Sequence, residues 1–152
     1  MRPGRAGSPI GILLVEDNPA DVMLTREALS AVSVPHELHV AADGEQALQF
    51  VRKQGVHAGA PRPDLVLLDL NLPRRDGREV LAEIKGDPEL RTIPVIVLTT
   101  SVAAEDVQRA YHDHANAYLQ KPVNFDDFRA IISGLESFWL MAARLPTEPG
   151  GS

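Results

Sequence analysis

The chain has 152 residues and a formal net charge of -6, and its length suits one domain with one hydrophobic core. It contains no cysteine, which excludes disulfides and thiolate metal sites, and its acidic balance argues against a dedicated nucleic-acid binder. No apolar run is long enough to cross a bilayer and the first residues, MRPGRAGSP, do not read as a secretory signal, so we expect a cytoplasmic protein without a membrane partner.

Short apolar segments alternate with helical patterns between residues 10 and 142, which we take as one domain. Residues 1–9 are expected to be a flexible arm and residues 143–152 a flexible tail. The predicted strands are GILLVED (11–17), ELHVAAD (37–43), DLVLLDL (64–70), PVIVLTT (94–100) and AYLQKP (117–122). Three of these are runs of Leu, Ile and Val without alternation, which is typical of strands that are buried on both faces of a parallel sheet.

Each predicted strand is followed by a segment with helix signals. Asn18 followed by proline indicates an N-cap with proline at the first helical position. We expect a second helix to begin at Gly44, Asp76 to cap a third, Ser101 to cap a fourth, and a fifth to start near Phe125. Five strands that alternate with five helices predict a doubly wound α/β fold. In such folds the ligand site lies beyond the carboxyl ends of the strands, at the switch point of the sheet.

Charged and hydroxyl side chains occur where four of the predicted strands end. Glu16 and Asp17 follow the first strand, Asp69 the third, Thr99 the fourth and Lys121 the fifth. If the first and third strands are neighbours, three carboxylates converge, and both Lys121 and a bound Mg²⁺ would relieve their repulsion. A carboxylate beside such a metal can attack phosphorus and form an acyl phosphate. We therefore predict that Asp69 is the residue on which chemistry occurs.

Each of these residues also has a plainer interpretation. Aspartate at a strand end is often a turn former, and the Glu16–Asp17 pair can be ordinary charge at a helix terminus. Thr99 can be a β-branched strand residue, and lysine before proline is commonplace. The prediction of a site rests on all of them falling at the ends of separate strands.

Four segments carry a resemblance to a known family: LLVEDNPAD, PDLVLLDLNLPRRDG, IPVIVLTTS and AYLQKPVN. In their order and spacing they resemble the receiver domains of two-component response regulators, over about residues 10–140. The resemblance implies a flavodoxin-like (βα)5 sandwich with a five-stranded parallel sheet of order 2-1-3-4-5. It also implies a phosphorelay function, in which Asp69 accepts a phosphoryl group from a histidine kinase. Such a protein is not an enzyme beyond removing its own phosphoryl group.

The resemblance assigns the metal site by position. Asp17 is similar to the direct Mg²⁺ ligand of the family and Glu16 to the acidic residue that acts mainly through water. Asp69 and the main-chain carbonyl of Asn71 would complete the site.

The resemblance also assigns the residues that respond to phosphorylation. Thr99 is similar to the switch hydroxyl, Lys121 to the phosphate-binding lysine and Tyr118 to the rotating aromatic residue. Gly77 lies where the loop after the acceptor needs a permissive backbone, and Pro122 would follow a cis peptide bond.

A longer match, DLNLPRRDGREVLAEIK together with LTTS, is similar to the small stand-alone regulators of phytochrome histidine kinases. The chain after Pro122 suffices for one helix and a tail, so we expect output by protein contact. Its segment ESFWLMAARLP has more apolar residues than one helix face buries. We expect Ile132, Phe138 and Trp139 to form a partner surface and predict a homodimer through the fourth helix, fifth strand and fifth helix. Alternatively, the helix end folds back onto its own sheet.

Two other functions compete with the phosphorylated regulator. One is a receiver-like scaffold that is never phosphorylated, whose usual mark is loss of the acidic or acceptor residues. The other is a phosphohydrolase of the haloacid-dehalogenase type, which usually has a second aspartate two residues after its nucleophile. Asn71 occupies that position here, which counts against the hydrolase.

Overall fold

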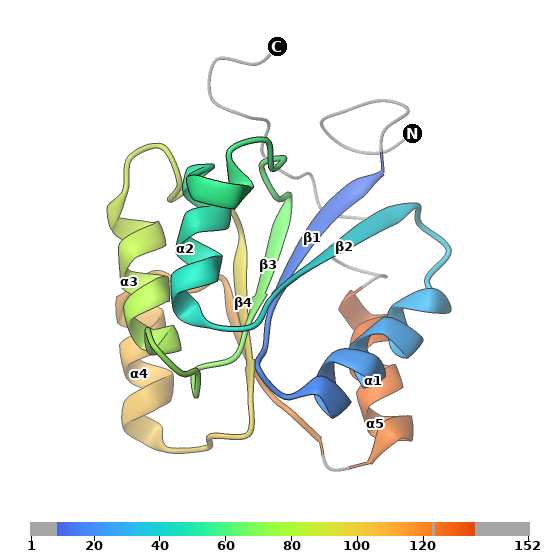
Figure 1. Ribbon diagram of the computed structural model, residues 1–152. Helices are drawn as coiled ribbons and strands as arrows, with labels where there is room; N and C mark the ends of the chain where they lie inside the picture. The colour runs from blue at the N-terminus through green and yellow to red at the C-terminus, as the bar shows by residue number, and fades with distance from the viewer. Residues whose placement is uncertain (1–8, 123, 136–152) are drawn as a thin grey trace.

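The structure, a computed structural model, describes residues 9–122 and 124–135 and has the predicted flavodoxin-like architecture. Five parallel strands form one sheet in the order β2-β1-β3-β4-β5. Helices α1 and α5 cover one face of this sheet, and α2, α3 and α4 cover the other (Figure 1). None of the helices in the described residues is long and apolar enough to span a membrane.

The strands and helices alternate as the sequence predicts. The strands are β1 (Ile10–Val15), β2 (His36–Ala41), β3 (Leu65–Leu68), β4 (Val95–Thr99) and β5 (Ala117–Gln120). The helices are α1 (Pro19–Ser30), α2 (Gly44–Arg52), α3 (Gly77–Gly86), α4 (Ala104–His112) and α5 (Phe125–Leu135), with a 3-10 turn η1 (Gly55–His57) after α2.

The three central strands are buried on both faces, which explains their unbroken apolar sequence. Every residue of β1, β3 and β4 is buried. Because successive side chains of a strand point to opposite faces, Leu13 and Val15 of β1 enter the core beneath α2, α3 and α4. Ile12 and Leu14 enter the second core, beneath α1 and α5. The sheet is thereby held between two apolar layers.

Two of the predicted helix caps and the predicted start of α2 are confirmed, and a third predicted cap is wrong. The Asn18 side chain accepts hydrogen bonds at the start of α1, and Asp76 does so at the start of α3. Helix α2 begins at Gly44, with Asp43 as its cap. Ser101 does not cap α4, which begins three residues later behind Ala103, a residue without a side-chain cap. The Ser101 hydroxyl instead donates to Asp106 inside the helix, at 2.6 Å.

Strand register places two of the predicted acidic residues side by side. Val15 of β1 pairs with Leu68 of β3, so Glu16 and Asp69 are the next residues along two adjacent strands. The chain leaves β1 for β2 on one side and returns to β3 on the other, which makes this pair of strands the switch point of the sheet. A site at this edge therefore follows from topology and register together.

Of the three residues predicted to form a partner surface, only Ile132 is among the described residues, and the prediction for it is wrong. Ile132 is 1% exposed, because α5 packs Phe128, Ile132 and Leu135 against the sheet at spacings of four and three. These residues form the inward stripe of the helix, so Ile132 cannot be on an outer one. Phe138 and Trp139 lie outside the described residues, as do residues 1–8 of the predicted arm at 1–9 and the whole predicted tail at 143–152.

The predicted cis bond before Pro122 is also wrong. The described residues contain no cis peptide bond, and the Lys121–Pro122 bond is among them. A trans X-Pro bond is the lower-energy form by about 0.5–1 kcal/mol.

Candidate functional site

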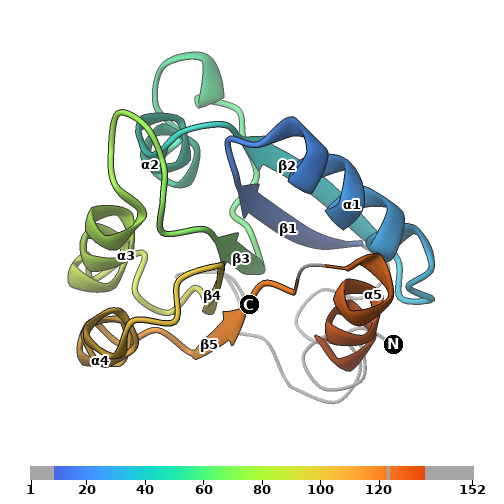
Figure 2. The same cartoon turned by 90° about the horizontal axis from the view of Figure 1, so that it is seen from below.

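The predicted site residues converge at the carboxyl ends of the strands, the edge that faces the viewer in Figure 2. Asp69, Thr99, Lys121 and Glu16 all come from separate strand ends and are all buried. A buried charged group is costly unless it is paired and hydrogen-bonded. The partners of each group therefore show how the site is built.

Asp69 is held by donors on both of its carboxylate oxygens. The Thr99 hydroxyl donates to Oδ1 at 2.9 Å, and the main-chain N–H of Asn71 donates to the same atom at 3.1 Å. The Lys121 ammonium donates to Oδ2 at 3.1 Å. Three elements, the end of β4, the loop after β3 and the end of β5, thus fix the orientation of one carboxylate.

Lys121 lies at the centre of the acidic residues. Its Nζ donates to Glu16 Oε1 at 2.6 Å, Asp21 Oδ2 at 3.0 Å and Asp69 Oδ2 at 3.1 Å. Burial lowers the pKa of Lys121, but the hydrogen bonds to Glu16 and Asp21 and the charge of Asp69 raise it further, so that it ends above its usual value. The side chain is therefore a fixed positive charge at neutral pH.

Glu16 has a partner on each oxygen. Its Oε1 accepts from Lys121, and its Oε2 accepts from the main-chain N–H of Asn18 at 3.1 Å. Burial raises the pKa of Glu16, and the bond from Lys121 offsets this in part. The residue thus joins the start of α1 to the end of β5.

The chemistry of this donor set fits a hard divalent cation. The carboxylates of Glu16, Asp21 and Asp69 all pair with the ammonium of Lys121, so negative charge is in excess here, and Asp17, the residue after Glu16, is exposed. No three acidic or histidine side chains in the described residues already converge at metal-binding distance. Mg²⁺ does not need three, because it uses one or two carboxylates and completes its shell with water and carbonyl oxygens.

Gly77 is required at the site for a different reason from the predicted one. It lacks the positive φ that would need a permissive backbone. A Cβ at this position would instead lie 2.2 Å from the carbonyl oxygen of Asp69 and 2.6 Å from Cα of Leu70. The main-chain N–H of Gly77 also donates to the carbonyl of Leu70 at 2.9 Å. Glycine therefore lets the start of α3 pack directly on the acceptor loop.

A polar network connects Thr99 to helices α3 and α4. The main-chain N–H of Ser101 lies 3.5 Å from the Thr99 hydroxyl, and the Ser101 hydroxyl donates to Asp106. Asp106 also accepts two bonds from the Arg78 guanidinium, both at 2.8 Å. Arg78 in turn lies 3.4 Å from the carbonyl of Leu70, the residue after Asp69. The network thereby starts and ends beside Asp69.

The charges of this network reinforce one another. The hydrogen bond from Arg78, together with that from Ser101, lowers the pKa of Asp106 from its ordinary 3.8 to about 2. The hydrogen bond to Asp106 in turn raises the pKa of Arg78. The pair therefore stays ionised over the physiological range and ties α3 to α4.

Tyr118, the predicted rotating aromatic residue, is attached to the same loop. Its hydroxyl donates to the main-chain carbonyl of Ser101 at 3.0 Å, and its side chain is half-buried against the core. Its main-chain N–H donates to the hydroxyl of Tyr111 on α4 at 3.2 Å. Any displacement of the loop after Thr99 would therefore reach Tyr118.

Sequence reasoning missed Asp21, Arg78 and Asp106. A signal existed for Asp21, because it follows Asp17 by four residues and lies in the first turn of α1, which starts beside Glu16. No such signal exists for Arg78 and Asp106, which are 28 residues apart and meet only because α3 and α4 pack side by side.

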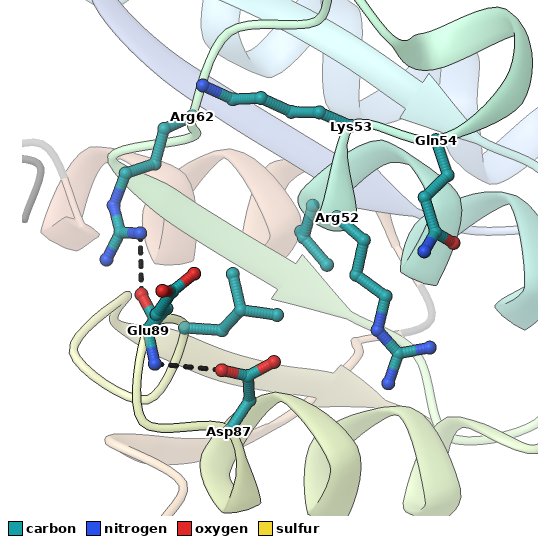
Figure 3. Close-up of a pocket in the computed structure, with 8 residues that line it drawn as sticks. Arg52, Lys53, Gln54, Arg62, Asp87 and Glu89 are labelled. Carbon is teal, nitrogen blue, oxygen red and sulfur yellow. Dashed lines mark hydrogen bonds between the residues drawn. The ribbon is translucent and has the colours of Figure 1, made fainter.

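A pocket lies toward the opposite ends of the strands from this site, between the end of α2 and the loop after α3 (Figure 3). It is lined by Arg52, Lys53 and Arg62 together with the acidic residues Asp87 and Glu89. Arg62 donates to the main-chain carbonyl of Glu89 at 2.7 Å, which closes one side of the pocket. Its lining mixes both charge signs.

Comparison with known proteins identifies relatives over most of the chain. The family described as response regulator receiver domain matches residues 12–133. Response regulator Rcp1 of Synechocystis is 51% identical over 138 residues, which cover 91% of this chain and 94% of the relative.

Solved structures agree with these matches. The Mn²⁺-bound form of Rcp1 superposes with a TM-score of 0.87 at 51% identity, covering 91% of this chain and 99% of the other. A phosphorylated cyanobacterial phytochrome response regulator, RcpA, superposes with a TM-score of 0.88 at 50% identity and the same coverage.

Proposed function

The chain belongs to the response regulator receiver domain family, and on that premise we propose that Asp69 accepts a phosphoryl group from the phosphohistidine of a histidine kinase. The observation that carries this proposal is the convergence of Thr99, Lys121 and the N–H of Asn71 on one buried carboxylate. These groups are the donors that a phosphoryl group on Asp69 would need. A relative at 50% identity whose structure is of the phosphorylated form supports phosphorylation of this chain.

In the proposed reaction a carboxylate oxygen of Asp69 attacks phosphorus in line. The bond from phosphorus to the imidazole nitrogen breaks, and its electron pair stays on that nitrogen. The product adds roughly -1.5 to -2 charges to the site. Lys121 and Thr99 then donate to the phosphoryl oxygens in place of the carboxylate, which draws the end of β4 inward.

We further propose that the site holds Mg²⁺, with Asp17, Asp69 and the carbonyl of Asn71 as ligands and Glu16 acting through water. A divalent cation would neutralise charge on the phosphoryl oxygens during transfer. Glu16 is buried and already bonded on both oxygens, which suits an indirect role. The Mn²⁺-bound form of a relative at 51% identity supports the binding of a divalent metal by this chain.

The partner we propose is a phytochrome histidine kinase. A cyanobacterial phytochrome response regulator is 50% identical to this chain over 91% of its length. Rcp1 matches over 94% of its own length, which supports a regulator that acts as a receiver alone. We propose that loss of its own phosphoryl group is the only reaction that it catalyses. We place it in the cytoplasm as part of the same proposal, because kinases draw phosphoryl groups from the ATP held there.

We also propose a homodimer through the face formed by α4, β5 and α5. Within the described residues this face offers Val102 and Tyr111, which are 66% and 51% exposed. Val102 lies in the loop before α4 and Tyr111 near the end of that helix, and exposed apolar side chains of this kind are candidates for contact with a partner. Ile132 takes no part in this proposal, because it is in the core.

The test is the intact mass of the protein after incubation with acetyl phosphate. Wild type should gain one phosphoryl group only when Mg²⁺ is present, and Asp69→Asn should gain none. A time course after removal of the donor measures loss of the group, and transfer from a phosphorylated phytochrome kinase tests the partner. A wild-type protein that gains no mass from either donor would contradict the proposal and favour an unphosphorylated scaffold.

A further inference from the structure

The ammonium of Lys121 has one partner that the proposed reaction does not explain. Glu16 and Asp69 belong to the metal and acceptor chemistry, but Asp21 belongs to neither. Asp21 lies in the first turn of α1 and accepts from Lys121 Nζ at 3.0 Å. Its side chain is 26% exposed, whereas that of Lys121 is only 6% exposed. Asp21 therefore reaches the buried ammonium from the solvent side.

All three N–H groups of Lys121 are used by carboxylates before any phosphoryl group arrives. Lys121 can pass the N–H that it donates to Asp69 to one phosphoryl oxygen, but it can donate to a second one only by releasing Glu16 or Asp21. Releasing Glu16 would cost more free energy, because Glu16 is 4% exposed and its bond to Lys121 is the shortest of the three, at 2.6 Å. Releasing Asp21 costs less free energy, because water can solvate its carboxylate when the bond breaks.

Electrostatic repulsion also favours the release of Asp21 from Lys121. The phosphoryl group adds roughly -1.5 to -2 charges beside Asp69. The carboxylate of Asp21 shares an ammonium with Asp69, so it repels that added charge at short range once Lys121 turns away from it.

We propose that Asp21 is a positioning residue that holds Lys121 in the unphosphorylated state and competes with the phosphoryl group for its ammonium. This role rests on the proposed function of Asp69. Asp21 thereby lowers the occupancy of the phosphorylated form at a given donor concentration. Removing its charge should favour that form.

The experiment measures binding of beryllofluoride, a phosphoryl mimic, by fluorine NMR at saturating Mg²⁺. We expect Asp21→Asn to bind it roughly three- to tenfold more tightly than wild type, as for loss of one partly screened charge at this range. Asp21→Glu, which keeps the charge, should stay near wild type. The matched control is Glu27→Gln, the same charge change at an exposed position of the same helix, and it should leave the affinity unchanged.

A gain of affinity is informative because damage to the fold would lower it. Unchanged or weaker binding by Asp21→Asn would overturn the role of Asp21 while leaving the function of Asp69 intact. An equal gain in Glu27→Gln would also overturn it, because general charge would then explain the effect. A wild-type protein that neither binds beryllofluoride nor gains mass from acetyl phosphate would overturn both proposals.

Discussion

At Gly77 the first turn of α3 lies against the loop after β3, at the backbone of Asp69 and Leu70. A Cβ atom at position 77 would collide with that backbone. The same loop is fixed by its own side chains. Arg74 pairs with the buried Asp43 at 3.0 Å, and Arg75 pairs with Glu83. The loop that carries Arg74 and Arg75 is thus anchored to α2 and α3.

We expect Gly77→Ala to destabilise the protein by about 1–3 kcal/mol, the usual cost of overpacking a tight site. The control is Gly86→Ala at the other end of the same helix, where a Cβ would meet nothing within 4 Å. That change should stabilise by about 0.5–1 kcal/mol, because alanine loses less backbone entropy than glycine. Urea unfolding of the two variants measures both values. Equal effects at the two positions would show that close packing at Gly77 is not important.

At the scale of elements, the Arg78–Asp106 pair links the start of α3 to the first turn of α4. Both side chains are mostly buried, at 21% and 15% exposed, and Ser101 adds a bond from the loop that follows Thr99. Inward movement of Thr99 would pull on Ser101 and so on α4. A local change of charge at Asp69 would thereby bias the position of a whole helix.

Asp106→Asn should therefore lower the stability at neutral pH by about 1 kcal/mol, since it removes a charged hydrogen-bond partner of Arg78. Because the folded-state pKa of Asp106 is lowered to about 2, its contribution is fully present above its ordinary pKa of 3.8 and is lost as pH falls through about 2. The variant should thus lose less stability than wild type between these values.

Urea unfolding at several pH values checks this prediction, with Glu105→Gln as the control. Glu105 is the exposed neighbour of Asp106 in the same helical turn, so the change of charge near the helix start is the same. We expect it to alter stability by less than about 0.5 kcal/mol. An acid dependence identical in Asp106→Asn and wild type would contradict the link.

In the whole molecule, the two apolar layers hold the sheet as a rigid base. Conformational change is therefore expected in the loops at the carboxyl ends of the strands. β1, β3 and β4 are buried throughout, whereas β5 and α4 carry half-buried and exposed residues. The face around α4 and β5 is also the one attached to Thr99 through Ser101 and Tyr118. A surface that responds to phosphorylation is therefore expected there, and the proposed homodimer uses it.

Sedimentation velocity at high micromolar concentration tests this homodimer. Wild type should sediment as a dimer, and Val102→Glu should weaken it by placing a charge beside α4. Val56→Glu is the control, because Val56 is 92% exposed and lies in η1, away from this face. Wild type that sediments only as a monomer, or equal weakening by both substitutions, would rule out this interface.

The fold class, the five strands, four of the helix starts and the identity of the residues at the strand ends could all be predicted from the residues alone. These follow from local rules, because apolar runs, caps and strand ends are properties of short segments. The sequence could not determine that Ile132 faces the core, since residues 131 and 132 are both isoleucine and helical spacing alone admits either. Nor could the sequence show why glycine is needed at position 77, because this depends on how closely α3 approaches the loop after Asp69.

Which charged groups share a partner became known only from the folded chain. Asp21 and Lys121 are 100 residues apart, and Arg78 and Asp106 are 28 apart, so each contact depends on the register of the sheet and the packing of helices on it. A hydrogen bond requires placement to within a few tenths of an ångström, which no pattern of residue types encodes. The sequence thus identified the groups that carry the proposed chemistry, and the folded chain decided which of them compete for the same ammonium.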